Sequence, residues 1–382
     1  MPWDTRNLMS LRREFVLLAL NEDTNRRELC RRFGISPKTG YKWLARYADD
    51  EVASLGDRSR RPLHSPSRTA PELEARVVEL RKEHPAWGGR KLSKRLKKLG
   101  YRDAPEPSTI TSILHRHGLI DTQASIQATH WRRFEHARPN ELWQIDFKGY
   151  FPTPGGVCYP LTVIDDHSRF NLVLAACANP NFHGVQPPLA EAFRRYGLPV
   201  RINGDNGSPW GSPSKCEHGI TRLTVWLMRL GICISHSAPA HPQTNGKDER
   251  FHRSLDAEVL KGRSFNDLAQ AQRAFDQWRP IYNEQRPHDA LGLDTPIERY
   301  RPSPRAFPEQ LPAIEYGPHD VVAVVGWNGR VRFKGRTIKV SNALHKLPIA
   351  FRPDPNLDGA YDVYFCHKNF MRLNFRDFSK LA

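Results

Sequence analysis

The sequence predicts a multidomain protein in which two helical units precede a central mixed α/β domain and a β-rich region follows it. The length of 382 residues is too great for one small core and suggests several domains. Apolar residues recur at helical spacing over residues 8–47 and 71–119. From Trp143 the pattern changes to short apolar runs that are typical of strands. Residues 301–315 are rich in proline and separate the tail, residues 316–382, from the rest.

The first unit, residues 1–53, contains three predicted helices joined by short turns. Gly34 ends the second helix, and Ser36 and Pro37 start the third as N-cap and first helical residue. This is the pattern of a helix-turn-helix, whose last helix points polar side chains into the major groove of DNA. The predicted DNA-facing residues are Lys38, Thr39 and Lys42. The alternative is a small helical bundle with a solvated basic face.

Residues 54–70 are rich in proline, serine and arginine and are predicted to form a linker. The linker is either merely flexible or an arm that follows the DNA backbone or minor groove. In the second case its spaced arginines contact DNA: Arg58, Arg60 and Arg61. A second helical unit follows at residues 71–120, and its predicted helices lie around residues 73–80, at Arg90–Leu99 and at Ser108–His117.

After a linker at residues 121–135, the central domain is assigned to residues 136–300. Three consecutive antiparallel strands come first, and helices then alternate with strands. The strands are predicted at Leu142–Phe147, Val157–Asp165, Phe170–Ala176, Val200–Asn203 and Ile232–Ser235. The helices are predicted at Leu189–Tyr196, at Arg222–Leu230, around Glu249 and at Phe265–Tyr282.

Three acidic residues from separate segments of this domain suit chemistry on phosphates. Asp146 and Asp205 lie at or near strand ends, and Glu249 lies just inside a helix. Carboxylates hold Mg²⁺ together with substrate phosphate, and two such ions can activate an attacking oxygen and stabilise a leaving one. Nearby basic residues would position the phosphates: Lys247, Arg250 and Arg253. Each acid considered alone is typical of a turn-forming residue or of a solvated helix residue. The three local sequences together favour a metal site.

The local sequences around these acids resemble those of a known family. They are Leu142-Trp-Gln-Ile-Asp-Phe-Lys-Gly149, Arg201-Ile-Asn-Gly-Asp-Asn-Gly207, His241-Pro-Gln-Thr-Asn-Gly-Lys-Asp-Glu-Arg-Phe-His-Arg253 and Tyr282-Asn-Glu-Gln-Arg-Pro-His-Asp-Ala-Leu291. They are similar to the integrase core of bacterial insertion-sequence transposases, relatives of retroviral integrases with an RNase H-like fold and an Asp-Asp-Glu triad. The resemblance is strong over residues 130–305 and assigns the catalytic, metal-binding triad to Asp146, Asp205 and Glu249.

The resemblance implies a DNA transposase that binds terminal inverted repeats, hydrolyses the phosphodiester at the element ends and joins the freed 3′-hydroxyl to target DNA. It implies Mg²⁺ as cofactor, for which Mn²⁺ can substitute, and a homodimer or higher multimer on double-stranded DNA. The second helical unit resembles a further helix-turn-helix, with Thr109, Ser112 and Arg116 facing DNA. The alternatives are a catalytically relict DNA-binding regulator and a nuclease without strand transfer.

The chain departs from the family pattern between the second and third acids. Asp205 and Glu249 are 44 positions apart, more than is usual, and the excess is assigned to Ser208–Thr221. Gly204 stands where many relatives have a small hydroxyl residue. Trp210 either stacks on an unpaired DNA base at the rim of the site or packs under the loop.

Two other possible ligand sets rank below the triad. Asp165 and Asp166 also lie at a strand end, but their sequence context is typical of a turn between strands. The set Cys216, His218, Cys233 and His236 has no common zinc spacing.

The charge distribution indicates a polyanionic partner. The net charge is +17, and residues 1–120 hold 25 Lys and Arg against 15 Asp and Glu. Six scattered cysteines are typical of the reducing cytoplasm. The resemblance to bacterial transposases implies that this is a bacterial cytoplasm and that the protein is associated with the nucleoid. No apolar run approaches the roughly 18 residues that a membrane span needs.

In the tail, strands are predicted at Val321–Val325, Arg330–Lys334 and Thr337–Val340. The resemblance implies a small SH3-like β-barrel. Its basic face would be formed by Arg330, Arg332, Lys334, Arg336 and Lys339.

Overall fold

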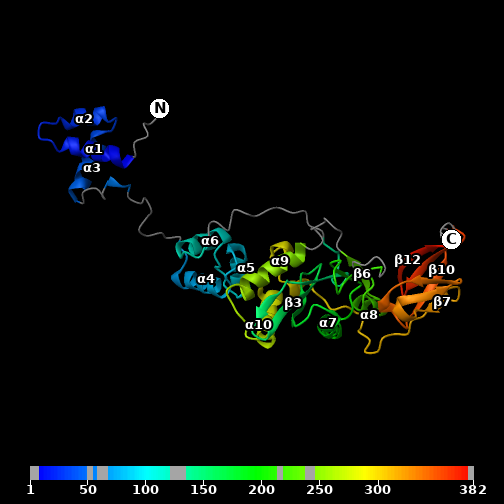
Figure 1. Ribbon diagram of the computed structural model, residues 1–382. Coiled ribbons are helices and arrows are strands. Elements are labelled where there is room, and N and C mark those ends of the chain that lie inside the picture. The colour runs from blue at the N-terminus through cyan, green and yellow to red at the C-terminus, as the bar shows by residue number, and fades with distance from the viewer. Residues whose placement is uncertain are drawn as a thin grey trace. The chain divides into compact units, whose positions relative to one another are not determined.

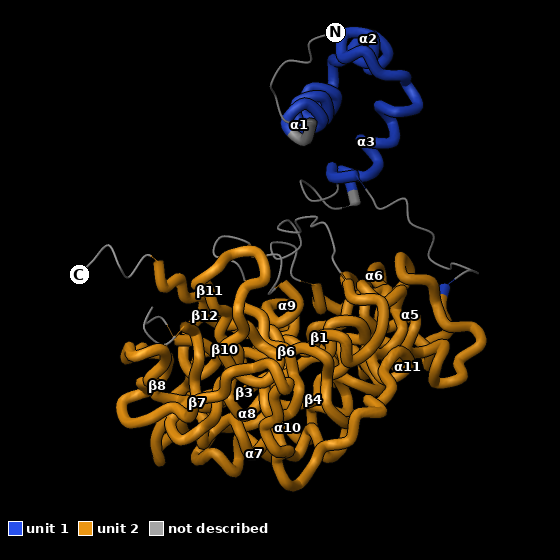
Figure 2. Tube along the Cα trace, turned by 90° about the vertical axis from the view of Figure 1, so that its right-hand side faces the viewer, with its two compact units in different colours: residues 1–68 blue, residues 69–382 orange. Residues whose placement is uncertain are grey.

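The computed structural model of the protein describes residues 8–49, 55–57, 68–120, 135–212, 218–236 and 246–376. The chain divides into two compact units, residues 1–68 and residues 69–382 (Figure 2). Each unit has a buried apolar core of its own. Within the described part of the chain, no helix is both long and apolar enough to span a bilayer.

The smaller unit contains three helices, α1 (Leu8–Ala19), α2 (Arg26–Arg32) and α3 (Pro37–Asp49), at the blue end of the chain in Figure 1. As predicted, the Ser36 hydroxyl caps α3 by accepting the Thr39 N–H at 3.2 Å. The helices approach closely at Gly40, where a Cβ would lie 2.6 Å from the Sγ of Cys30. Leu55 is fully buried in this core, so the first described residues of the predicted linker pack against the helices.

The second helical unit consists of α4 (Pro71–Glu83), α5 (Gly89–Lys98) and α6 (Pro107–Arg116), around a core that contains Trp87. It belongs to the same compact unit as the central domain. The Lys98 ammonium pairs with Glu298 at 2.5 Å, and Arg95 Nη2 donates to Gln285 Oε1 at 2.8 Å. The basic side of α5 therefore contacts the central domain, which the sequence did not predict.

The central domain is built on a six-stranded mixed sheet. Its strands are β1 (Leu142–Phe147), β2 (Phe151–Thr153), β3 (Gly156–Asp165), β4 (Asn171–Cys177), β5 (Arg201–Gly204) and β6 (Cys233–His236). β3 pairs antiparallel with β1, β2 and β4, while β1, β5 and β6 run parallel to one another. This is the predicted order, with β2 added, a strand too short to show an alternating pattern.

Helices cover both faces of this sheet. One face packs against α7 (Phe182–Tyr196) and α8 (Arg222–Arg229), and the other against α9 (Gly246–Leu255) and α10 (Leu268–Pro280). Short helical turns follow at Asp256–Leu260, Ile281–Gln285 and Asp289–Leu291, and α11 spans Pro296–Arg299. α7 begins earlier than predicted because Asn181 caps it, accepting the Gly184 N–H, ahead of the two prolines inside the helix.

The C-terminal region is antiparallel β-structure, drawn in orange to red in Figure 1. Four strands form one sheet in the order β12 (Lys368–Asn374), β11 (Ala360–Phe365), β10 (Pro348–Pro353) and β7 (Val321–Val324). β8 (Arg330–Phe333) and β9 (Arg336–Lys339) form a separate hairpin, and 3₁₀ turns lie at Trp327–Gly329 and Asn342–Leu344. The core of this region includes Val225 and Met228 of α8, so it is joined to the central domain. Closure into a barrel stays a prediction.

Candidate active site

Asp146 and Asp205 come from neighbouring parallel strands. β1 and β5 are in register so that Gln144 is opposite Asn203. Two residues further along, this register sets Asp146 of β1 beside Asp205, which directly follows β5. Neighbouring strands lie about 4.8 Å apart. The two acids therefore lie at the same end of adjacent strands.

The side chain of Asp146 lies on the sheet face that α9 covers. Side chains alternate along a strand, and its neighbour Ile145 belongs to the core under α7 and α8. Asp146 is opposite Thr162 in β3. The Thr162 hydroxyl donates to the Asp146 carbonyl at 3.0 Å and lies 2.9 Å from Nε2 of His252 in α9. These contacts link the strand of the first acid to the helix of the third.

The pKa of Asp146 is raised because the side chain is buried and other carboxylates lie nearby. Its pKa is raised to about 6, mainly by burial and further by the charges of Asp205 and Glu249. The Phe147 N–H, which donates to Asp146 Oδ1 at 2.8 Å, acts in the opposite direction on this pKa. The three acids are thus close enough for the second and third to disfavour ionisation of the first.

Glu249 lies exposed in the first turn of α9, where the helix dipole favours a negative charge. The helix is anchored by Phe251, which is buried in the core against α10. Burial lowers the pKa of His252 to about 4, so the ring in contact with Thr162 is neutral at physiological pH. Asp248 is also buried, and burial together with the charges of Asp146 and Asp166 raises its pKa.

Asp165 and Asp166 have structural partners. Asp165 Oδ1 accepts the Ser168 N–H and hydroxyl at 2.8 and 2.6 Å, and its Oδ2 accepts the Asn140 N–H at 2.7 Å. Asp166 accepts hydrogen bonds from His136 and Gln144 and pairs with Lys247. Both acids are almost fully buried, so their oxygens are occupied in the turn that the sequence predicts.

Trp210 is buried, with 4% of its surface exposed. It packs in the core under α7 and α8, and its ring lies 5.7 Å from that of Phe147. Of the two predicted roles, packing under the loop is the one the structure supports. Part of Ser208–Thr221, residues 213–217, lies outside the described residues.

The donor set of the proposed triad fits a hard divalent cation, because Mg²⁺ is usually bound by one or two carboxylates together with substrate phosphates. The raised pKa of Asp146 is consistent with carboxylates gathered without a compensating charge. Within the described residues, no group of three or more His, Cys, Asp or Glu side chains is arranged to hold a metal ion by itself. Of the alternative zinc set, Cys216 lies outside the described residues, and the five described cysteines are free thiols.

Several predicted DNA contacts lie at the surface. Lys38 and Lys42 are exposed on α3, and Thr109 and Ser112 are exposed on α6. Arg250 and Arg253 are exposed on the helix of Glu249, and neither has an ion-pair partner among the described residues.

Three other predicted contacts are engaged within the protein. The Thr39 hydroxyl lies 2.9 Å from that of Ser36, and Arg116 pairs with Glu74 at 3.1 Å. Lys247 is largely buried in its pair with Asp166. Arg58, Arg60 and Arg61 lie outside the described residues.

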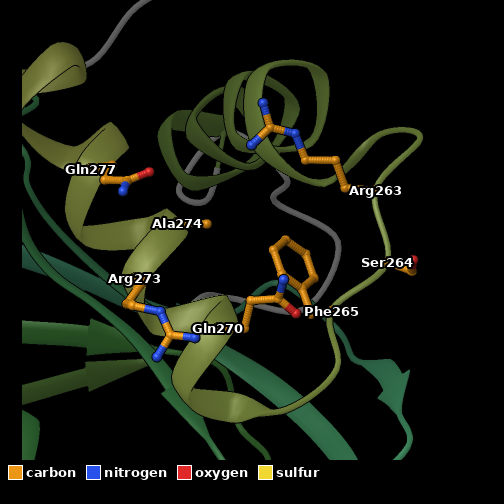
Figure 3. Close-up of a pocket in the computed structure, with 7 residues that line it drawn as sticks. All are labelled: Arg263, Ser264, Phe265, Gln270, Arg273, Ala274 and Gln277. Atoms are coloured by element: carbon orange, nitrogen blue, oxygen red, sulfur yellow. The ribbon is translucent and has the colours of Figure 1, made fainter.

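Sequence reasoning missed Thr162 and Asp248 as neighbours of the triad, and it missed the contact of His252 with Thr162. The only local signal was the position of His252, nearly one turn after Glu249 on the same helix. A pocket of about 360 Å³ lies elsewhere, between α10 and the loop before it (Figure 3). It is lined by Arg263, Ser264, Phe265, Gln270, Arg273, Ala274 and Gln277 and contains none of the three acids.

Comparison with known families finds integrase and DNA-binding domains in the chain. Integrase core domain families match residues 136–242 and residues 230–296. A homeodomain-like domain matches residues 39–114, and a helix-turn-helix domain matches residues 11–62.

Similar curated proteins include products of bacterial insertion elements. The chain is 28% identical over 247 residues to the insertion element IS407 uncharacterized 31.7 kDa protein of Burkholderia multivorans, covering 63% of this chain and 86% of the relative. It is 26% identical over 249 residues to the IS476 uncharacterized 39.2 kDa protein of Xanthomonas euvesicatoria, covering 62% and 66%. Among solved structures, the HTLV-2 integrase catalytic core domain in complex with magnesium matches with a TM-score of 0.33 and 16% identity, covering 43% of this chain and 99% of that chain.

Proposed function

From the premise that this chain is an insertion-element transposase-like protein with helix-turn-helix segments and an integrase core, we propose that it is a DNA transposase. It binds the terminal inverted repeats of its element, hydrolyses a phosphodiester at each end and transfers the freed 3′-hydroxyl strand into target DNA. The acids that carry this chemistry are Asp146, Asp205 and Glu249.

The observation that carries the proposal is the register of β1 and β5, which sets Asp146 beside Asp205 at the same end of two adjacent strands. The pKa of Asp146 is raised to about 6, mainly by burial and further by the charges of Asp205 and Glu249, which reach the site from the end of β5 and from α9. Such crowding of carboxylates is costly unless a cation binds among them, so it is typical of a site that is completed by metal.

The three acids would hold two Mg²⁺ ions, or Mn²⁺ in their place, which activate the attacking oxygen and stabilise the leaving one. Arg250 and Arg253 lie exposed on the same helix as Glu249 and would neutralise the phosphates of the bound strand. The buried Lys247 instead holds the start of α9 against Asp166. Because two element ends must be brought together, the active form would be a homodimer or higher multimer on DNA.

A plasmid that carries the gene with its native flanking DNA provides the substrate for a test. Asp146→Asn, Asp205→Asn and Glu249→Gln should each reduce end cleavage and joining by several orders of magnitude while leaving DNA binding nearly intact. The matched control is Glu284→Gln, which removes an exposed carboxylate of the same domain and should retain activity. Sequencing the junctions shows whether ends are joined to new sites.

The outcomes separate the alternatives. Cleavage without joining would identify a nuclease. Specific DNA binding without any cleavage by the wild-type chain would identify a regulator with a relict core. Normal activity of Asp205→Asn would rule out the triad.

A further inference from the structure

Trp210 contacts the chain next to both of the strand acids. Its ring centroid lies 5.7 Å from that of Phe147, the residue after Asp146. A Cβ added to Gly204, the residue before Asp205, would lie 3.0 Å from Trp210 Cγ and 3.1 Å from its Cβ. The indole is thus buried against the ends of the paired strands β1 and β5.

Backbone hydrogen bonds connect the segments around Trp210 to the carboxylates of Asp146 and Asp205. Asp146 Oδ1 accepts the Phe147 N–H at 2.8 Å, so the residue that the indole contacts also orients this carboxylate. Asp205 Oδ1 accepts the Gly207 N–H at 2.9 Å. The Gly207 carbonyl accepts the Gly211 N–H at 2.8 Å and closes the turn that carries the indole.

We infer that Trp210 is a positioning residue that sets the separation of the Asp146 and Asp205 carboxylates. The inference rests on the proposed function, because it assigns these two acids to one metal site. Trp210 is too buried to reach a substrate and acts through its contacts with Phe147 and Gly204.

The same contact explains the glycine at position 204. A methyl group there would meet the indole at a distance that forces one of them to move by a few tenths of an ångström. The Cβ of a small hydroxyl residue, the kind expected from the family pattern, would make the same short contact with this tryptophan. Gly204 and Trp210 therefore form a complementary pair.

The test uses the full chain with two readouts, Mn²⁺ binding measured by electron paramagnetic resonance and end cleavage of the plasmid at increasing Mg²⁺. Trp210→Ala should weaken Mn²⁺ binding and raise the Mg²⁺ concentration for half-maximal cleavage by about tenfold, because a 1 Å misplacement in a catalytic site can cost about 100-fold. Trp210→Phe, which keeps an aromatic ring near Phe147, should show a smaller change and guards against misfolding of the alanine variant.

The matched control is Trp226→Ala. Trp226 is buried in the same core, where its ring packs against those of Phe193 and Phe307, neither of which is a sequence neighbour of an acid of the triad. This variant should lower the melting temperature as Trp210→Ala does, but leave Mn²⁺ affinity and the Mg²⁺ requirement unchanged. A role for Trp210 in stability alone would give the two variants the same profile.

A double-variant cycle tests the complementary pair. Gly204→Ala should weaken Mn²⁺ binding in the wild-type background and do so less in the Trp210→Ala background, where the 3.0 Å contact with Cγ is gone and the 3.1 Å contact with Cβ remains. If the loss of Mn²⁺ affinity in the double variant equals the product of the two single losses, the two positions act independently.

The readouts separate this inference from the proposed function. A wild-type chain that binds Mn²⁺ but cleaves no DNA would refute the proposed transposase activity. The Mn²⁺ affinity of the variants would still test the positioning role of Trp210. Unchanged Mn²⁺ affinity in a folded Trp210→Ala, or an equal change in Trp226→Ala, would overturn the positioning role. A wild-type chain that neither binds metal nor cleaves would overturn both.

Discussion

Replacing Asp146 by asparagine should make the metal-free protein more stable at neutral pH, although it removes a proposed metal ligand. The pKa of this residue is raised from 3.8 to about 6 by burial and by the charges of Asp205 and Glu249. The folded protein therefore holds the proton more tightly than the unfolded chain does. Stability falls as pH rises from about 4 to about 6, and the deficit is complete above that window.

The size of the effect follows from the shift. One pKa unit corresponds to 1.36 kcal/mol, so the deficit is about 3 kcal/mol at most, and solvent screening of the partly accessible side chain reduces it to about 1–3 kcal/mol. Asparagine removes the charge and keeps an oxygen that can accept the Phe147 N–H. We expect a rise in melting temperature of a few degrees, since 1 kcal/mol corresponds to about 2–4 °C in domains of medium size.

The assay is thermal unfolding of wild type and Asp146→Asn, followed by circular dichroism in chelator at about pH 5 and about pH 8. The stability gap should be roughly twice as large at the higher pH. Added Mg²⁺ at the higher pH should stabilise the wild type more than the variant, because binding to the folded state shifts the unfolding equilibrium. Glu284→Gln, which removes an exposed carboxylate, should behave as wild type. A variant that is no more stable than wild type at either pH, or a gap independent of pH, would refute the reasoning.

Three further predictions concern other parts of the chain. Lys42→Ala should weaken binding to element-end DNA and reduce the magnitude of the slope of log affinity against log salt concentration by about 0.9. An unchanged slope would exclude a phosphate contact by this exposed side chain. His252→Gln should make stability less sensitive to acid, because burial, with a smaller effect of Lys148, lowers the pKa of this histidine to about 4. The contribution of His252 to wild-type stability is therefore complete above about pH 6.5 and falls by up to about 3 kcal/mol as the pH is lowered to about 4. Acid unfolding curves of the two proteins measure this difference. Lys98→Met should lower the melting temperature, and the loss should be smaller when Glu298 is already replaced by glutamine, which keeps an oxygen that can accept the Thr295 N–H at the start of α11. Because the pair is partly exposed, we expect a coupling of about 0.5–1 kcal/mol, and strictly additive losses would show that the pair does not hold α5.

The element order and the bounds of several strands followed from local sequence, whereas the start of α7 and the short strand β2 did not. β1 has the predicted bounds Leu142–Phe147, because apolar runs and their breaks report directly on which residues a strand buries. The start of α3 was equally local, since the Ser36 cap bonds to a residue only three positions away. The candidate acids were also found locally, as each lies in a short motif at the end of a strand or the start of a helix.

What the charged and aromatic side chains contact was decided by tertiary structure alone. Lys98 lies on a helix rich in lysine and arginine, and its side chain pairs with Glu298, 200 positions away. Lys247 stands in a motif rich in bases, yet it is buried against Asp166. Trp210 had two equal interpretations until the fold placed it against Gly204 and Phe147. A local pattern shows that a side chain is charged or aromatic, but its partner comes from a segment that only the folding of the whole domain brings near.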